Sequence, residues 1–256
     1  NEGTIGQIGQ TDRFVTFGQN VVDTKKTGRG GAISNASGSR IDAIYADFSD
    51  NYADYAGAIN NEGTIGQIGL ENRHSQFRNN NARGNASNTG GGAIHNRASG
   101  NITAIYADFH NNTVGTPNSS SFYGGAIANN GVIATIQGTF QENAASGDGY
   151  GGAIYNGTAF TGTRSAGTIN LITNSQFIEN RAANGGAIYN NDNSYGKNQI
   201  SAISGSTFQG NAANATNAGA GGAGGAIYNL GAIGQITGST FTENSASSYG
   251  GAIHNE

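Results

Sequence analysis

Two aspartates are the residues of this chain best spaced for acid–base chemistry. Asp47 and Asp108 each stand just before a phenylalanine, in two copies of the hexapeptide AIYADF. Glycoside hydrolysis needs two carboxyl groups about 5–9.5 Å apart, and residues two strands apart in one sheet lie roughly 9–10 Å apart. However, Gln76 occupies the position between them, and a residue next to an inward phenylalanine faces outward. We therefore interpret both carboxylates as part of a solvated face and expect no catalytic residue.

Metal chemistry has little support in the sequence. Asp50 and Asp54 follow Asp47 closely, but the next copy of the same segment offers Asn79 and Asn80 in place of acids. A calcium site of the polysaccharide lyase kind needs several acidic ligands from neighbouring segments. The tripeptide Gly147-Asp148-Gly149 occurs once, whereas a Gly-Asp calcium loop repeats. We expect neither a metal nor a cofactor.

The four histidines also fail to form a recognisable catalytic set. They are His74, His95, His110 and His254. His95 and His254 occupy the same position of two distant repeats, so they are too far apart to share a metal. No Ser-His-Asp combination is suggested, and we expect the chain not to be an enzyme.

The repeat that positions these residues has three blocks. The block GAI-x-N occurs eight times, seven of them as GGAI, and a block F-x-x-N occurs eight times in phase with it. A block I-x-x-I precedes each phenylalanine, beginning for example at Ile65 and Ile102. The joins between blocks vary in length while the blocks do not, which is typical of packed segments separated by surface loops.

Three short apolar blocks per repeat predict three short strands per turn of a coil. Glycine inside every unit and the absence of a 3.6-residue period exclude helical repeats. We expect an all-β, right-handed parallel β-helix (β-solenoid) of about eight turns over residues 1–256, because parallel crossovers are nearly always right-handed. Chemically identical side chains would then lie about 4.8 Å apart in successive turns.

The repeated asparagines are interpreted as two structural ladders. Asparagine tolerates left-handed backbone angles at bends, and its amide can donate to one neighbour and accept from the other. The two rows are Asn35, Asn61, Asn96, Asn129, Asn156, Asn190, Asn229 and Asn255, and Asn20, Asn51, Asn80, Asn112, Asn143, Asn180, Asn211 and Asn244.

One outward row is aromatic. The residue after each GAI faces outward by alternation, and three consecutive repeats place Tyr155, Tyr189 and Tyr228 there. Exposed aromatic rows bind sugars or proteins, while a row of this kind also serves as a cross-strand ladder that stabilises the face. Both interpretations stay open.

Composition restricts the partners. The chain has 12 Lys and Arg against 16 Asp and Glu, and a net charge of -4. Nucleic acid and anionic membrane surfaces both require basic clusters, so we expect neither as a partner. No apolar stretch is long enough to span a bilayer, so we expect no membrane insertion of this segment. The chain has no methionine and starts within the repeat pattern, which suggests a processed piece of a longer repeat protein.

The GGAI and FxxN blocks in phase resemble the polymorphic membrane proteins of chlamydiae and, more broadly, the Gly- and Asn-rich autotransporter passengers of Gram-negative bacteria. The resemblance covers the whole chain. It implies a solenoid carried to the bacterial cell surface by a C-terminal barrel, which this segment does not contain. It also implies a role in adhesion or self-association.

Two functions from different classes follow as expectations. The first is a non-catalytic adhesive segment whose variable loops, such as Gly157–Thr168 and Asn211–Ala223, contact a host or neighbouring-cell protein or glycan. The second is a fibre subunit that stacks on itself head to tail. The chain begins with the sequence NEGTI and ends with IHNE, and the internal segment Ile59–Ile65, INNEGTI, resembles the end of the chain followed directly by its beginning. A polysaccharide-active enzyme is the third and least favoured class.

Overall fold

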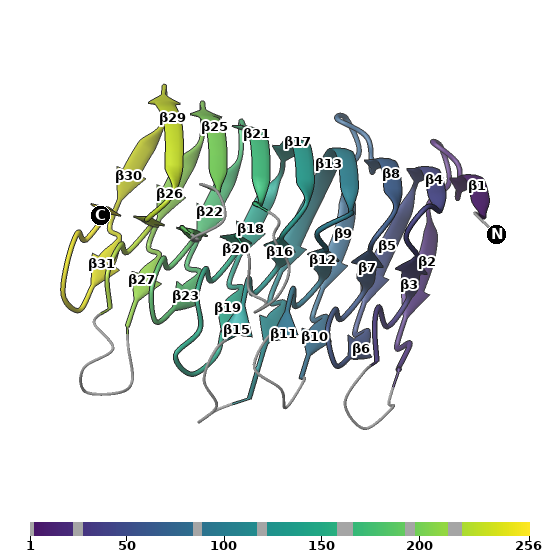
Figure 1. Cartoon of the computed structure of the whole chain (residues 1–256), viewed down its shortest axis with the longest axis horizontal. Coiled ribbons are helices and arrows are strands. Elements are labelled where there is room, and N and C mark those ends of the chain that lie inside the picture. The colour runs from purple at the N-terminus through teal and green to yellow at the C-terminus, as the bar shows by residue number, and fades with distance from the viewer. Residues whose placement is uncertain are drawn as a thin grey trace.

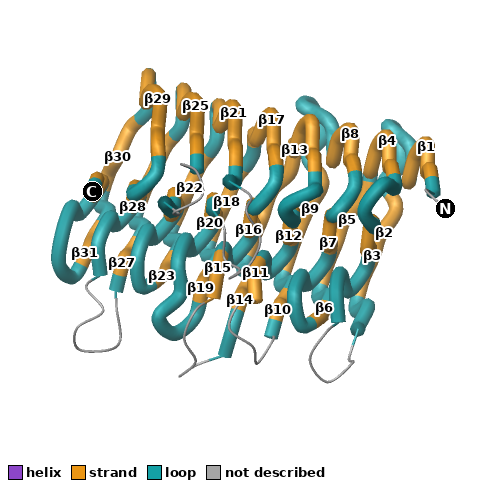
Figure 2. The backbone as a smooth tube through the Cα atoms, in the orientation of Figure 1, coloured by secondary structure: helices purple, strands orange, loops and turns teal. Residues whose placement is uncertain are grey.

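The computed structural model describes residues 3–22, 28–83, 89–116, 122–157, 166–192, 198–214 and 222–256. All regular elements in these ranges are β-strands, and equivalent strands of successive repeats lie side by side from the N-terminal to the C-terminal end (Figures 1 and 2). Equivalent strands pair in parallel. These features confirm the predicted parallel β-solenoid, while its right-handed sense stays a prediction.

The largest sheet contains both the Ile and the Phe blocks. Its 15 strands form two ladders that share β13 (Asn101–His110). The other strands of the Ile ladder are β1 (Thr4–Ile8), β4 (Arg40–Ile44), β8 (Thr64–Ile68), β17 (Val132–Gln137), β21 (Thr168–Thr173), β25 (Gln199–Ser204) and β29 (Ala232–Thr237). The other strands of the Phe ladder are β2 (Val15–Gly18), β5 (Ala46–Ser49), β9 (Ser75–Arg78), β18 (Thr139–Gln141), β22 (Gln176–Ile178), β26 (Thr207–Gln209) and β30 (Thr240–Thr242).

The GAI blocks form a sheet of eight strands, one from each repeat. They are β3 (Ile33–Asn35), β7 (Ile59–Asn61), β12 (Ile94–Asn96), β16 (Ile127–Asn129), β20 (Ile154–Asn156), β24 (Ile188–Asn190), β28 (Ile227–Asn229) and β32 (Ile253–Asn255). The stacking of all eight blocks in one sheet agrees with the repeat count read from the sequence.

A third sheet of seven two-residue strands follows the FxxN asparagines and was not predicted. Its strands are β6 (Tyr52–Ala53), β10 (Asn81–Ala82), β14 (Thr113–Val114), β19 (Ala144–Ala145), β23 (Arg181–Ala182), β27 (Ala212–Ala213) and β31 (Ser245–Ala246). A two-stranded pair, β11 (Thr89–Gly90) with β15 (Phe122–Tyr123), lies apart from it. The coil therefore has three main sheets, but two predicted blocks share one of them.

Like stacks on like in the interior. Phe109 pairs with Phe77 on one side and Phe140 on the other, and all three are fully buried. The rings of successive Phe residues stack with centroids 4.6 to 5.2 Å apart. The isoleucines of the I-x-x-I and GAI blocks complete this core, except Ile5 and Ile253 at the two ends of the coil. Burying each such side chain contributes about 1.5–3 kcal/mol.

Both predicted asparagine rows are hydrogen-bonded ladders. Along the FxxN row, Asn80 donates from Nδ2 to Oδ1 of Asn112 at 2.9 Å and to the carbonyl of Phe48 at 3.0 Å. Along the GAI-x-N row, Nδ2 of Asn96 donates to Oδ1 of Asn129 at 2.8 Å. Donors point toward the C-terminal end in both rows, so each ladder has a direction.

The left-handed backbone expected at the ladder asparagines lies one residue earlier. The residue before each FxxN asparagine has a positive φ, which is +64° at Gly210 and between +53° and +57° at the others. These residues are Gln19, Asp50, Asn79, Asn111, Glu142, Glu179, Gly210 and Glu243. The chain turns at that exposed position, and this turn lets the following asparagine side chain enter the ladder.

The glycine pair of GGAI serves two different purposes. Gly124 has φ of +69°, and a Cβ there would lie 2.0 Å from the carbonyl oxygen of Ile127. A Cβ on Gly125 would lie 2.0 Å from the carbonyl oxygen of Gly152 in the next turn. The first glycine thus permits the turn and the second permits the close approach of neighbouring turns. Ala56, which replaces the first glycine in AGAI, is not among the residues with positive φ.

Most of the loop Gly157–Thr168 and much of Asn211–Ala223 lie outside the described residues. Among the described residues, no helix is long and apolar enough to cross a membrane.

Candidate binding surfaces

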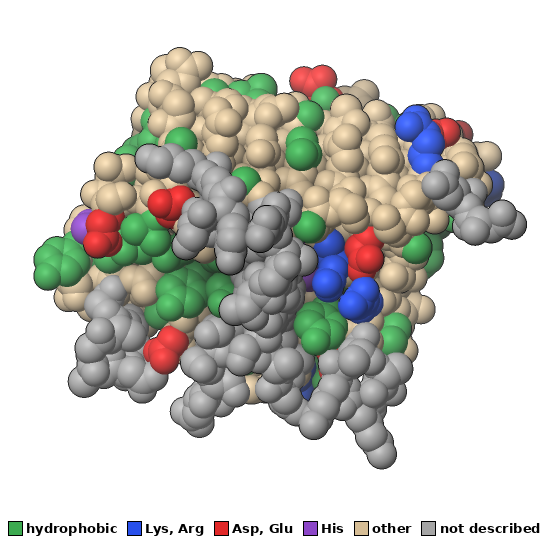
Figure 3. All heavy atoms as spheres, viewed as in Figure 1, with side chains coloured by type: hydrophobic (Ala, Val, Ile, Leu, Met, Phe, Trp, Pro, Cys, Tyr) green, Lys and Arg blue, Asp and Glu red, His purple; other side chains and the backbone are tan. Residues whose placement is uncertain are grey.

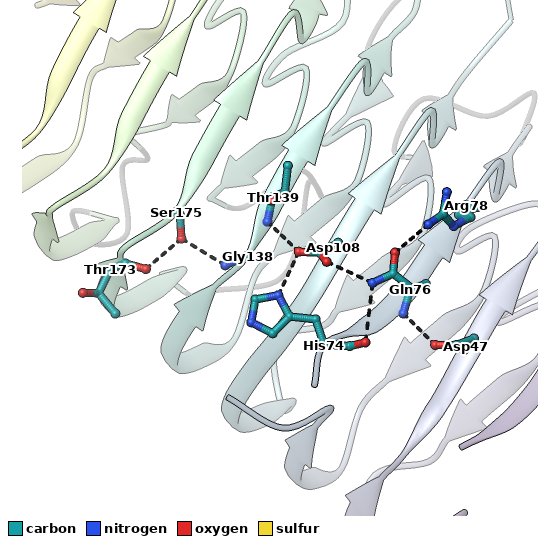
Figure 4. Close-up of polar contacts among 9 residues, drawn as sticks. All are labelled: Asp47, His74, Gln76, Arg78, Asp108, Gly138, Thr139, Thr173 and Ser175. Atoms are coloured by element: carbon teal, nitrogen blue, oxygen red, sulfur yellow. Dashed lines mark hydrogen bonds and ion pairs between the residues drawn. The ribbon is translucent and has the colours of Figure 1, made fainter. Parts of the chain in front are cut away.

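A polar network covers the outer face of the Phe ladder from the second to the fifth repeat (Figure 4). Asp47 on β5 accepts the backbone N–H of Gln76 at 2.9 Å. Asp108 on β13 accepts the backbone N–H of Thr139 at 2.9 Å and the side-chain amide of Gln76 at 2.9 Å. Gln76 thus lies between the two aspartates, as the sequence places it, and bonds to both.

His74 completes this network. Its Nδ1 lies 2.8 Å from Oδ1 of Asp108. The hydrogen bond to Asp108 raises the pKa of His74 above its usual value, against the effect of burial. For Asp108, burial acts to raise the pKa, but hydrogen bonds from His74, Thr139 and Gln76 outweigh it and lower the pKa overall. Asp108 is therefore an ionised acceptor, whereas a glycosidase needs one carboxyl group with a raised pKa as its acid.

A serine ladder follows further along the coil, in the buried column one residue before the column of the aspartates. Ser175 accepts the backbone N–H of Gly138 at 3.3 Å and donates to the carbonyl of Thr173 at 2.9 Å (Figure 4). Ser206 accepts the backbone N–H of Ser175 at 3.2 Å in the same way. Side chains thus accept backbone N–H groups of a neighbouring turn both in the outward aspartate column and in the buried serine column.

One open depression lies over this face, and a second lies at the adjoining corner of the coil. The first has a volume of about 270 Å³ and is lined by Gln76, Arg78, Asp108, Phe109, His110, Thr139 and Gln141. The second has a volume of about 340 Å³ and is lined by Asp50, Asn51, Tyr52, Asn79, Asn81, Arg83, Asn111 and Thr113. Side-chain amides, hydroxyls and charged groups supply most of both linings, which suits a hydroxyl-rich ligand better than an apolar one.

An exposed ladder runs through the second depression. Asn111 donates to Asn79 at 2.9 Å, and Asn79 donates to Asp50 at 3.2 Å. These are the left-handed residues at the corner of the coil. Their side chains stay at the surface, so the corner presents a row of polar groups from three neighbouring turns.

The aspartates considered for metal binding have separate partners. Asp47 bonds to Gln76, Asp50 bonds to Asn79, and Asp54 accepts the backbone N–H of Gly28 at 2.8 Å. Within the described ranges, no group of three or more His, Cys, Asp or Glu residues could hold a metal ion. Gly147-Asp148-Gly149 forms a turn in which Gly149 donates to the carbonyl of Ser146 at 3.1 Å.

The histidines other than His74 lie in three different settings. His95 is fully buried, with Nε2 2.9 Å from Oδ1 of Asn130, and burial lowers its pKa to about 3. Nε2 of His110 lies 3.8 Å from Glu142, and Nε2 of His254 lies 3.6 Å from Glu256. The four histidines are not brought together.

The predicted aromatic row is in register. Tyr155 pairs with Tyr189, which pairs with Tyr228, and His254 continues the row. Tyr155 and Tyr189 are only 2% and 6% exposed, because Tyr123 and Tyr150 pack against them. Burial raises the pKa of both buried tyrosines, so both stay neutral.

The accessible part of the row lies at its C-terminal end. The ring of Tyr228 stacks on His254 with centroids 5.0 Å apart, and that of Tyr249, which is 64% exposed, also stacks on His254 with centroids 5.5 Å apart. In Figure 3, hydrophobic side chains gather toward this end of the visible face, beside a histidine and carboxylates. A binding role for Tyr155, Tyr189 and Tyr228 stays a prediction, and only Tyr228 of the three offers surface for it.

Sequence reasoning missed Arg78 and His110 in the first depression and the pairing of His74 with Asp108. Arg78 and His110 each follow the phenylalanine of an FxxN block, so the register of these blocks could have predicted that they are neighbours in successive turns. His74 lies in a join of variable length, so no register argument could place it.

Comparison with known proteins agrees with the resemblance seen in the sequence. Residues 174–191 and 238–256 match the family model of the Chlamydia polymorphic membrane protein (Chlamydia_PMP) repeat. Each matched segment contains one FxxN and one GGAI block. No curated protein and no solved structure gives a significant match. In these two segments the solenoid therefore carries repeats similar to those of the chlamydial polymorphic membrane proteins.

Proposed function

We propose that this chain is a non-catalytic adhesive segment of a surface-displayed protein. The polymorphic membrane protein repeats and the β-solenoid fit the passenger part of a surface protein. The chain then acts as a stiff support whose outer side chains and loops contact a protein or glycan on a host or neighbouring cell.

The contrast between inner and outer positions carries this proposal. The phenylalanine of every repeat stacks on its equivalent, whereas the outward residue before it is Thr, Asp or Gln in different turns. That outward column reads Thr16, Asp47, Gln76, Asp108, Thr139, Gln176, Thr207 and Thr240. A scaffold with a uniform interior and a varied surface is suited to presenting contacts.

Binding and turnover should be measured on the same purified segment. We expect the immobilised segment to retain cells or cell-surface extracts in a saturable manner, and to release no reducing ends from polysaccharides. Treating the cells with protease or with glycosidases identifies which class of receptor is bound. Saturable binding that survives both treatments would argue against adhesion through a protein or glycan. Release of oligosaccharides by the pure protein would argue against a non-catalytic role.

A second candidate function is head-to-tail stacking into a fibre. The direction of the asparagine ladders favours it. In the FxxN row the backbone N–H of each asparagine donates to Oδ1 of the asparagine in the following turn. A second copy stacked in phase on the C-terminal end would place Oδ1 of its Asn20 where it could accept the backbone N–H of Asn244. At the two edges Ile5 is 48% exposed and Ile253 is 39% exposed. A copy stacked in phase would pair these groups.

Electron microscopy and sedimentation of the purified segment test this second candidate. Fibres with the width of the single coil should form, and the double substitution Ile5→Lys with Ile253→Lys should prevent them by placing charge on both edges. A preparation of short rods of one length, unchanged by concentration, would exclude stacking.

A further inference from the structure

We propose that the depression lined by Arg78, His110 and Gln141 binds an anionic sugar, through a carboxylate or sulfate group held by Arg78. This inference rests on the proposed adhesive function and names the ligand class and the site. It concerns the outer face of β9, β13 and β18, where the first depression opens.

The network beneath this depression fixes the orientation of Arg78. Oδ2 of Asp108 can only accept when ionised, so it requires the Nε2 end of Gln76, which donates to it at 2.9 Å. The Oε1 end of Gln76 must then face the other way, where it accepts from the Arg78 guanidinium at 2.9 Å. Arg78 is thus held by a neutral group whose orientation is determined by Asp108.

Among the described residues, no carboxylate forms an ion pair with Arg78. Asp108 is already paired with His74 at 2.8 Å. Elsewhere, the guanidinium of Arg29 lies 2.6 Å from Glu62, that of Arg97 lies 3.2 Å from the same carboxylate, and Arg40 pairs with Asp42. A guanidinium held by an amide retains most of its charge and its remaining N–H donors for a ligand.

Further donors continue from Arg78 along the coil. His110 is the direct neighbour of Arg78 in the next turn, and Gln141 is the neighbour of His110 in the turn after that. The side chain of His110 is 39% exposed, and Thr139 adds a hydroxyl beside it. One forked cation at the end of a row of hydrogen-bonding side chains matches a sugar with one anionic group and several hydroxyls.

The shape of the site also favours a sugar. The depression has a volume of about 270 Å³, is open to solvent, and is lined in part by Asp108, Phe109 and His110 of β13. It offers few apolar side chains, which excludes a mainly hydrophobic ligand. A single arginine on a chain of net charge -4 is also too little for nucleic acid.

Binding of defined polymers to the intact chain tests the site. The probes are polygalacturonate with its fully methyl-esterified form, and dextran sulfate with dextran. We expect the chain to bind at least one anionic polymer and neither neutral partner. Whether polygalacturonate, dextran sulfate or both bind distinguishes a carboxylate from a sulfate. Arg78→Gln should weaken that binding about tenfold or more, since it removes charge-assisted hydrogen bonds.

Arg181→Gln is the matched control, because Arg181 is an exposed arginine on β23 that does not line the depression. Its binding should equal that of the unchanged chain, and melting curves of both variants should coincide with it. Arg78→Lys should retain part of the affinity, because lysine keeps the charge but not the fork.

Several outcomes overturn the site. Equal losses in Arg78→Gln and Arg181→Gln would mean diffuse electrostatic attraction, and equal binding of charged and neutral polymers would remove the role of the anion. Failure to bind either anionic polymer, with retention of cells by the same preparation, would overturn the site and leave the adhesive function standing. If the chain binds neither the anionic polymers nor cells, both the site and the adhesive function are overturned.

Discussion

Asn80 and Asn112 are joined by two hydrogen bonds that end on one atom. The backbone N–H and the side-chain Nδ2 of Asn80 both donate to Oδ1 of Asn112, at 3.0 and 2.9 Å. Nδ2 of Asn112 in turn donates to the carbonyl of Phe77 at 2.9 Å and to Asn143 at 3.0 Å. One fully buried side chain thus serves three turns of the coil.

Replacing Asn112 with alanine should destabilise the chain strongly. Two donors of Asn80 and the carbonyl of Phe77 would lose their partners in the interior, and each such group costs about 1–3 kcal/mol. We expect a loss of about 3–5 kcal/mol in the free energy of unfolding, measured by urea denaturation. Asn244→Ala at the C-terminal turn is the control and should cost less, because Asn244 is part of the exposed edge. Equal losses at both positions would contradict the buried ladder.

The second glycine of GGAI should not tolerate a side chain. In Gly125→Ala the new Cβ would lie 2.0 Å from the carbonyl oxygen of Gly152 and 2.6 Å from the backbone nitrogen of Ala144. Both contacts are with backbone, so neighbouring turns must separate, and we expect a loss of about 3 kcal/mol or more. Gly6→Ala has open space around its Cβ and should change stability by less than about 0.5 kcal/mol. A Gly125→Ala chain with unaltered melting would show that the turns are not this close.

Acid should destabilise the chain partly through His95. Burial lowers its pKa in the folded chain to about 3, below the ordinary value of 6.5. The unfolded chain therefore binds the proton more readily between these values, and stability falls as pH drops from about 6.5 toward 3. His95→Asn, which introduces the residue found at Asn60 one turn earlier, should flatten this part of the profile in thermal melts from pH 7 to pH 4. An unchanged slope would show that folding does not lower the pKa of His95.

The pair of His74 and Asp108 should act in the opposite sense at neutral pH. The raised pKa of His74 contributes stability that is complete below its ordinary value of 6.5 and is lost as pH rises through the folded pKa. The lowered pKa of Asp108 contributes stability above its ordinary value of 3.8 that is lost as pH falls through the folded pKa. The pair thus contributes most between about pH 4 and 6.5.

Asp108→Asn tests this pair. The difference in melting temperature from the unchanged chain should be largest near pH 5 to 6 and should narrow at pH 8 and above. NMR titration of the His74 ring should show its pKa fall in the variant. A pH-independent difference would mean that the pair is not ionised.

The register was predictable because each core position is marked by one residue type. Phe on Phe, Ile on Ile and Asn on Asn leave a single alignment, and the observed pairs of Phe77 with Phe109 and Asn96 with Asn129 follow it. The third sheet was missed because its strands carry no such marker. A signal was present, since the residue two after each FxxN asparagine is Ala or Val, as at Ala82 and Val114.

The surfaces were less predictable than the core. The alternation of side chains along a strand predicts that Tyr155 and Tyr189 point away from the core of the coil. It does not predict that Tyr123 and Tyr150 pack over them. His74 meets Asp108 across 34 residues through a join whose path the repeat does not determine. Contacts made by variable segments depend on loop conformation, which no repeat pattern encodes.

Distances between spin labels in one outward column test the stacked register most directly. Ser49, Arg78, His110, Gln141, Ile178, Gln209 and Thr242 are successive neighbours in this column. Cysteine pairs for labelling at Ser49 with Gln209 and at Ser49 with Thr242 span five and six turns. We expect two narrow distance distributions, centred at ~24 Å and ~29 Å, which differ by one strand spacing. Broad distributions, or a Thr242 distance that is no longer than the Gln209 distance, would contradict it.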